Sequence, residues 1–230
     1  MGCIFTHQNN DQPNDGLDTV SFSVKPVADN LIDVSLQSFP TDVSLQSFPK
    51  DAQSLDQIFD MKGQVVVAKV VKIYDGDTIT CIINNMNQWI KYRIRLSDID
   101  TCEMKLNAKN ISPEDSPYIE RSIRCGRVAK ARLINLISCG RVVYDTENID
   151  KTYPDTIDRL IKDLNIFVRI KIEKFESKYG RQLGWIYDLN DLNCARSFNQ
   201  ILLDEHYAYP YNGGSKLTIL EQLKFLHQPI

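Results

Sequence analysis

The sequence lacks any hydrophobic run long enough to cross a bilayer. None of its 230 residues belong to a stretch approaching the roughly 18 consecutive apolar residues of a transmembrane helix. The N-terminal region also lacks the apolar segment of a secretory signal. Hydrophobic residues make up 43% of the chain and charged residues 25%, as in an ordinary globular protein. We therefore expect one globular domain, monomeric and without a membrane-spanning segment.

Paired cysteines and clustered histidines are missing as well. The six cysteines are scattered without a CxxC pair, and His7, His206 and His227 are not spaced as zinc ligands with them. In the absence of a secretory signal, the cysteines are interpreted as free thiols. The sequence thus predicts neither a disulfide framework nor a zinc centre.

Basic residues are scarce in the first 60 positions. Residues 1–60 contain nine Asp, no Glu and two Lys, a net charge of −7, which leaves 25 basic and 21 acidic residues, a net charge of +4, for residues 61–230. The segment 1–60 is predicted to be a disordered acidic tail, because it has few large apolar groups to bury. Its tandem copies at 33–40 and 42–49 indicate a duplicated linker or, alternatively, a short partner-binding motif. The basic remainder, 61–230, suits a phosphate-backbone binder.

The first six residues fit the pattern M-G-x-x-x-[ST] for N-myristoylation. Gly2 would accept the myristoyl group, and Cys3 is placed for palmitoylation. Two acyl chains anchor a protein stably, whereas one gives only marginal binding. In a eukaryotic cell this pattern predicts a cytoplasmic protein held at the cytoplasmic face of a membrane. A chance match to so short a pattern is the alternative.

From Val65 onward the residues alternate between β-branched or aromatic and polar types, with helical spacing in between. Strands are predicted at 65–73, 78–83, 89–96, 142–144, 167–175 and 182–187. Helices are predicted around 128–137, ended by Gly140, and at 157–164, 196–205 and 217–227. Residues 104–120 are expected to be a loop and 145–165 an insertion. The order predicts an α+β fold, a five-stranded Greek-key barrel of the OB type with about three helices.

Carboxylates and arginines stand at the ends of the predicted strands: Asp77, Arg95, Asp100, Glu103 and Arg181. Each is weak evidence alone, since Asp-Gly is also a common hairpin turn. A barrel, however, would bring the strand ends to one rim. Two aspartates and a backbone carbonyl suit a hard cation such as Ca²⁺. Arginines match phosphate oxygens, and a further carboxylate can deprotonate water. Together they predict a phosphodiesterase site.

Three segments resemble the signature motifs of the staphylococcal nuclease (thermonuclease) family. They read Val-Lys-Ile-Tyr-Asp-Gly-Asp-Thr at 71–78, Arg-Leu-Ser-Asp-Ile-Asp-Thr-Cys-Glu at 95–103 and Lys-Tyr-Gly-Arg at 178–181. They occur in the family's order, and the resemblance extends from about Val65 to the C-terminal helix. It implies a calcium-dependent endonuclease that cleaves DNA or RNA and leaves 3′-phosphate products.

The resemblance also implies a role for individual residues. Asp77, Asp100 and the carbonyl oxygen of Thr101 would bind Ca²⁺. Glu103 matches the general base that activates water. Two departures from the family pattern stand out: Cys102 occupies a position where proline is common, and the insertion 145–165 has no counterpart in the family's minimal form.

On the substrate side, Arg95 and Arg181 match the pair that contacts the scissile phosphate, and Tyr179 matches a tyrosine packed near it. Tyr209 and Tyr211 resemble base-stacking positions without a clear assignment of either one. These residues complete the set that the resemblance implies.

Two other functions compete with the nuclease. Domains of this family can lose catalysis and only bind nucleic acid or protein, although all five catalytic-type residues are retained here. A generic OB-fold could instead bind single strands through aromatic residues. The aromatic residues available for this are interpreted as barrel core or rim: Tyr92, Phe167, Phe175, Trp185 and Tyr187.

Overall fold

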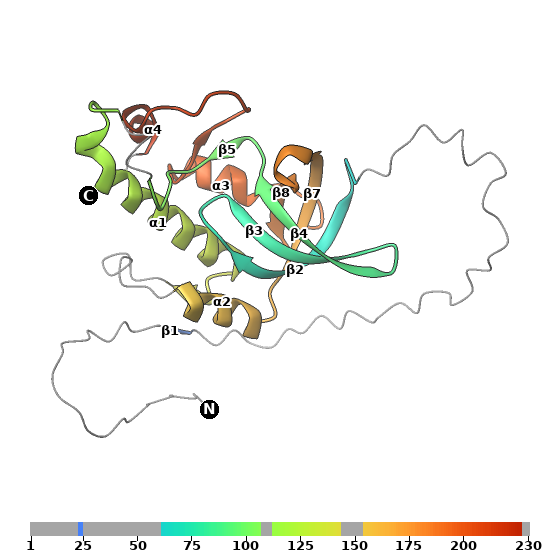
Figure 1. The fold of residues 1–230 in the computed structure, drawn as a ribbon. Coiled ribbons are helices and arrows are strands. Elements are labelled where there is room, and N and C mark those ends of the chain that lie inside the picture. The colour runs from blue at the N-terminus through green and yellow to red at the C-terminus, as the bar shows by residue number, and fades with distance from the viewer. Residues whose placement is uncertain (1–22, 25–60, 107–111, 144–153, 227–230) are drawn as a thin grey trace, which may run out of the picture.

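A closed five-stranded β-barrel forms the centre of the protein (Figure 1). The computed structural model describes residues 23–24, 61–106, 112–143 and 154–226. The barrel strands are β2 (Val65–Ile73), β3 (Thr78–Asn85), β4 (Gln88–Leu96), β7 (Phe167–Glu176) and β8 (Arg181–Asp188). The prediction of a five-stranded barrel within an α+β fold is therefore confirmed.

The strands follow one another around the barrel in the order β2, β3, β4, β8, β7. The first three form an antiparallel meander, and β7 and β8 form an antiparallel hairpin. Antiparallel pairing of β2 with β7 closes the barrel, while β4 and β8 run parallel and pair Arg95 with Leu183. The mixed sheet thus places the ends of β4 and the start of β8 side by side.

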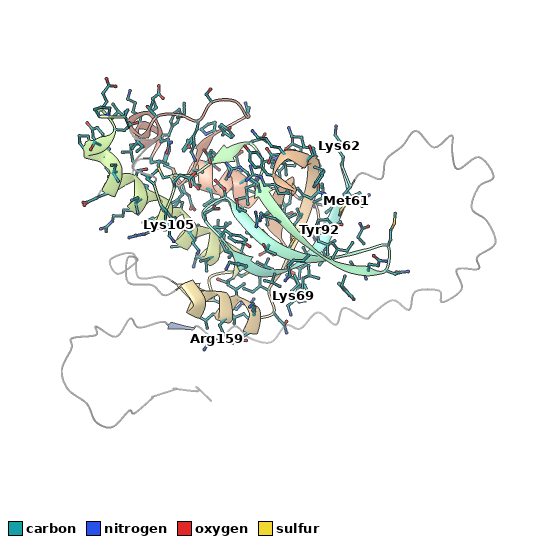
Figure 2. All side chains as sticks on the ribbon, in the orientation of Figure 1. Met61, Lys62, Lys69, Tyr92, Lys105 and Arg159 are labelled. Atoms are coloured by element: carbon teal, nitrogen blue, oxygen red, sulfur yellow. The ribbon has the colours of Figure 1, made fainter. Side chains whose placement is uncertain are left out.

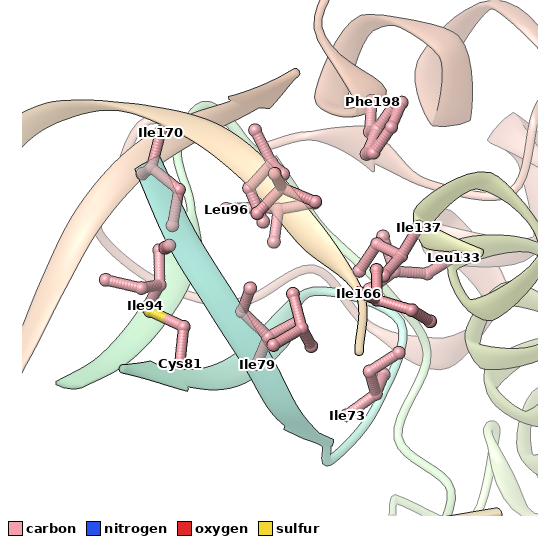
Figure 3. Close-up of a cluster of buried hydrophobic side chains, with 14 of the residues drawn as sticks. Ile73, Ile79, Cys81, Ile94, Leu96, Leu133, Ile137, Ile166, Ile170 and Phe198 are labelled. Atoms are coloured by element: carbon pink, nitrogen blue, oxygen red, sulfur yellow. The ribbon is translucent and has the colours of Figure 1, made fainter. Parts of the chain in front are cut away.

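Branched aliphatic side chains fill the barrel and the space between it and the helices (Figure 3). Ile79 and Ile94 are fully buried inside the barrel, and Leu133 and Ile137 of the long helix close one side of the same core. Burial of one such side chain contributes about 1.5–3 kcal/mol. The alternation of aliphatic and polar residues along β2, β3 and β4 is thereby explained.

In the described part of the chain, four α-helices pack on the barrel or on one another, and each overlaps one of the four predicted helical ranges. They are α1 (Ile119–Ile137), α2 (Pro154–Asp163), α3 (Phe198–Asp204) and α4 (Ile219–Phe225). The predicted loop 104–120 ends in a 3₁₀ turn at Ser116–Tyr118, and the part 107–111 lies outside the described residues. In the predicted insertion, α2 lies along β2, where Arg159 and Lys69 mark the two elements in Figure 2. Residues 144–153 of the insertion are not among those described.

The end of α1 is capped differently from the prediction. Cys139, with φ of 51°, takes the left-handed position next to the helix, and Gly140 follows with φ of 74°. The amide of Gly140 donates to the carbonyl of Asn135 and that of Cys139 to Leu136. These two bonds form a Schellman motif, in which the glycine is one position later than its usual place.

Two small antiparallel sheets lie outside the barrel. β5 (Ile99–Asp100) pairs with β9 (Tyr209–Pro210), and β1 (Ser23–Val24) pairs with β6 (Val142–Val143). The strand predicted at 142–144 therefore exists at its first two residues, with its partner outside the barrel. The predicted disorder of residues 1–60 otherwise falls outside the described residues, as do Gly2 and Cys3.

None of the helices in the described part of the chain has both the length and the hydrophobicity needed to cross a bilayer. The aromatic residues interpreted as core or rim divide into two groups. Tyr187 is buried, whereas Phe167 and Phe175 are 43% and 53% exposed. Of the two alternatives, core or rim, the exposure of these two phenylalanines leaves the rim.

Helix α1 packs directly on the backbone that follows β5. Gly126 faces this backbone, and a Cβ atom added there would overlap the carbonyl oxygen of Cys102 and come within 3.1 Å of the Glu103 carbonyl carbon. The contact fixes the position of the segment that carries Thr101 and Glu103.

Gly126→Ala should lower the free energy of unfolding by about 1–3 kcal/mol, because the overlap involves backbone atoms that cannot rotate away. Helix propensity alone predicts the opposite sign, a gain of about 1 kcal/mol. Denaturant unfolding followed by circular dichroism measures the change. Arg121→Ala, at an exposed position of the same helix, serves as control and should change stability by less than about 0.5 kcal/mol. A stabilised Gly126→Ala protein would refute the close packing.

Candidate active site

The turn between β2 and β3 carries Asp77 into a buried position, with 2% of the residue exposed. Its Oδ1 accepts a hydrogen bond from Thr78 Oγ1 at 2.9 Å. Its Oδ2 accepts from both the backbone amide and the hydroxyl group of Thr101, each at 3.1 Å. Asp75 caps the turn by accepting the Asp77 amide at 3.2 Å. The Asp77 carboxylate is thus fixed by the two threonines beside it.

Gly76 is required in this turn for space rather than for backbone conformation. The Asp-Gly hairpin preference arises from a left-handed φ at the glycine. Gly76 does not have such a φ, so that preference does not explain the glycine here. A Cβ atom at Gly76 would lie 2.8 Å from the Cβ of Ala129 and 2.9 Å from Cγ2 of Thr101. The glycine therefore allows α1, the turn and the Thr101 segment to meet.

Arg95 joins the two aspartates predicted as metal ligands. The β3 and β4 register pairs Thr78 with Arg95, which starts the arginine side chain beside Asp77. Its Nη1 donates to Asp77 Oδ1 at 2.6 Å, and its Nη2 donates to Asp100 Oδ1 at 2.6 Å. Burial alone would lower the pKa of Arg95, but the charges of Asp77 and Asp100 outweigh it and raise that pKa. The guanidinium group therefore remains charged between the two carboxylates.

Asp100 is held by the C-terminal part of the chain. It lies on β5 opposite Tyr209 of β9, whose hydroxyl donates to Asp100 Oδ2 at 2.6 Å. Burial alone would raise the pKa of the Asp100 carboxyl. The charge of Lys216 and the hydrogen bond from Tyr209, with a further contribution from Arg95, hold that pKa below its ordinary value instead. Asp100 is thus ionised in a buried position.

Lys216 links Asp100 to the predicted general base. Its Nζ lies 3.1 Å from Asp100 Oδ2 and 2.7 Å from Glu103 Oε1. The Glu103 side chain is 53% exposed, which suits a group that must reach a water molecule. Glu103 therefore borders the buried pair of aspartates without being part of it.

Sequence reasoning missed the contacts of Lys216 and of Tyr209. Tyr209 is fully buried, so it cannot stack on a base, and the base-stacking interpretation is wrong for this residue. The Tyr211 ring centroid lies 6.0 Å from the Arg95 guanidinium carbon, so it remains beside the site. The only sequence signal near Lys216 was the Thr218–Glu221 capping box that begins α4.

Arg181 and Tyr179 form a neighbouring pair at the turn between β7 and β8. Gly180 between them has a left-handed φ of 59°. The Arg181 guanidinium carbon lies 4.7 Å from the Tyr179 ring centroid, and Nε donates to Glu176 Oε2 at 2.5 Å. The structure thus connects Asp77, Arg95, Asp100 and Thr101 through direct contacts, and Glu103 joins them through Lys216. Arg181 instead binds Glu176 and lies on the strand next to β4.

Negative charge exceeds positive charge among the side chains that contact one another around Asp77 and Asp100. The carboxylates are Asp75, Asp77, Asp100 and Glu103, and the cations are Arg95 and Lys216. Four negative and two positive groups sum to −2 when all are ionised. Burial, followed by the charge of Asp75, raises the pKa of Asp77, and Arg95 acts in the opposite direction. A further cation would lower the electrostatic cost of ionising Asp77.

Oxygen atoms dominate the donors available to such a cation. Across residues 61–106, 112–143 and 154–226, no three His, Cys, Asp or Glu side chains are arranged as a metal site. A cation here would bind the two aspartates, the Thr101 carbonyl and water, which is a ligand set for a hard ion. The donor chemistry and the charge of −2 both fit Ca²⁺.

No protein-family model matches the chain, and no curated protein is significantly similar to it. The staphylococcal nuclease family therefore stays a prediction from the three motifs.

Arg95→Met should lower the free energy of unfolding by about 3–5 kcal/mol, because it leaves two buried carboxylates without their shared cation. Denaturant unfolding measures the loss. Arg93→Met is the matched control, since Arg93 is an exposed arginine on the same strand, over the Tyr74 ring at 5.0 Å. That cation–π contact contributes about 0.5–1 kcal/mol. Equal losses in the two variants would contradict the bridging role of Arg95.

Proposed function

We propose that the chain is a calcium-dependent nuclease of the staphylococcal nuclease type, with a barrel of the OB type, that hydrolyses phosphodiester bonds in DNA or RNA. The observation that carries the proposal is the Arg95 fork, in which one guanidinium group binds Asp77 and Asp100 at 2.6 Å each. Metal-assisted phosphodiester hydrolysis requires a permanent cation, metal-binding carboxylates and a base that water can reach. One contact network holds all of these as Arg95, the two buried aspartates and the exposed Glu103.

Ca²⁺ would be held by Asp77, Asp100 and the carbonyl oxygen of Thr101. When bound, the ion polarises the phosphate and favours the deprotonation of a nearby water molecule. Its charge would also balance the −2 of the side chains, which supports this assignment.

The arginines would bind the phosphate from two strands. Arg95 lies at the end of β4 and Arg181 at the start of β8, and these strands are paired in the barrel. In the substrate complex, the Arg95 fork exchanges carboxylate oxygens for phosphate oxygens of similar geometry. Both guanidinium groups then stabilise the negative charge that develops on the phosphate. The Tyr179 ring orients Arg181 through the cation–π contact.

Glu103 would accept the proton of the attacking water molecule. The water oxygen forms a bond to phosphorus, the bond from phosphorus to the 5′ oxygen breaks, and that oxygen takes up a proton. The products are a 3′-phosphate end and a 5′-hydroxyl end. Lys216 holds Glu103 Oε1 at 2.7 Å and so positions this carboxylate near Asp100.

Glu103→Gln should reduce hydrolysis about 10²–10⁴-fold, because the amide cannot accept the proton. The full-length protein is assayed on single-stranded DNA, duplex DNA and RNA, with Ca²⁺ and with a calcium chelator. Glu114→Gln, an exposed glutamate before α1, is the control and should retain full activity. Cleavage that survives the chelator would exclude the calcium mechanism. No cleavage of any substrate by the folded protein would favour the binding-only module.

A further inference from the structure

The outward face of β8 is more apolar than the face that points into the barrel. Side chains alternate between the two faces of a strand, and the buried, inward set consists of Gln182, Gly184 and Ile186. The outward set consists of Arg181, Leu183, Trp185 and Tyr187. A strand with an ordinary solvated outer face would show the reverse distribution. Tyr187 of this row is buried and α3 packs beside β8, so it is the partly exposed Trp185 that needs an explanation other than the core.

This outward row of β8 runs from Arg181 to a pocket lined by Trp185 and Tyr187. The parallel register of β4 and β8 pairs Arg95 with Leu183, and Trp185 is the next outward residue. Beside Trp185 lies a pocket of about 310 Å³, lined among others by Asp98, Lys171, Tyr187 and Ser197. Its volume is at the lower end of the range for small-ligand sites. Asp98 is two residues before Asp100, so the pocket adjoins the candidate active site along the chain.

Trp185 is held in place as a platform in this pocket. Its indole Nε1 donates to Asp98 Oδ2 at 2.9 Å, and the Lys171 Nζ lies 5.9 Å from the ring centroid. Asp98 has a left-handed φ of 64°, and its carbonyl accepts the amide of Tyr211 at 2.9 Å. The same aspartate thus orients the indole and ties it to the segment that carries Tyr211 beside Arg95.

The chemistry of the pocket favours a base over a phosphate. A fixed aromatic ring with a cation at its face is the arrangement that binds single-stranded nucleic acid by stacking. The carboxylate of Asp98 repels phosphate, while Lys171 and the arginine pair attract it on either side. A base can enter the pocket only if it is not already stacked within a duplex.

We propose that Trp185 is the platform of a nucleobase subsite that binds an unpaired base of a single-stranded nucleic acid. This inference rests on the proposed function, because a nucleic-acid strand bound at Arg95 would continue into the subsite. The subsite gives the chain a preference for single-stranded over duplex substrate.

The two tryptophans of the chain allow a direct test. Trp89 is 72% exposed on β4, and Trp89→Phe leaves Trp185 as the sole indole. With a calcium chelator present to prevent hydrolysis, a single-stranded oligothymidine should quench the fluorescence of this variant and protect it from acrylamide. A duplex of equal length should do neither. Trp185→Phe, which retains Trp89, is the control and should show no change in emission.

Binding measured by fluorescence anisotropy should weaken about tenfold in Trp185→Leu, which removes one stacked base. Trp185→Phe keeps an aromatic ring and should recover most of that loss, which a purely structural role would not predict. If Trp185→Leu does not fold, the quenching experiment and the affinity of Trp185→Phe still test the subsite. Binding of the oligonucleotide without quenching of Trp185 would overturn the subsite.

Hydrolysis by the wild-type protein, assayed in parallel, separates the two proposals. Hydrolysis of DNA or RNA without quenching of Trp185 would reject the subsite and leave the nuclease standing. Quenching without hydrolysis of any substrate would support the subsite and reject the nuclease. Absence of both would reject both.

Discussion

The ion pairs of Arg95 are the interaction on which the candidate site depends. Asp77 comes from the turn before β3 and Asp100 from β5, and one guanidinium group fixes their separation. Two carboxylates buried this deeply would repel each other and lose solvation energy. The arginine offsets both costs, and α1 packs against the backbone around it through Gly76 and Gly126. The turn before β3, β5 and α1 therefore meet at the site around one charged side chain.

The residual charge gives the network its chemical character. With all of its groups ionised, this network has two negative charges more than positive ones. Polar tethers from Thr101 and Tyr209 hold the carboxylates in fixed directions. In the proposed function, the Arg95 fork leaves these oxygen donors when it binds phosphate, and a cation would take its place. The exposed Glu103 lies at the border of this group, where solvent can reach it.

Much of the barrel could be predicted because aliphatic residues alternate clearly along β2, β3 and β4. The face of β8 could not, since its outward residues Leu183, Trp185 and Tyr187 are more apolar than its inward ones. Similarly, the motif residues indicated Asp77 and Arg95, but not the partners that hold Asp100 and Glu103. Tyr209 is 109 positions from Asp100, and Lys216 is 113 positions from Glu103. Periodicity and short motifs carry no information over such separations.

The pairing of β5 with β9 also has a consequence for how the protein is made. Every barrel strand precedes residue 189, whereas Tyr209 and Lys216, which hold Asp100, come later. A nascent chain thus exposes all five barrel strands before the segment that completes the site has emerged from the ribosome. The segment synthesised after the barrel strands adds the remaining contacts of Asp100. Competence at the rim therefore requires synthesis to continue past Lys216, well beyond the last barrel strand.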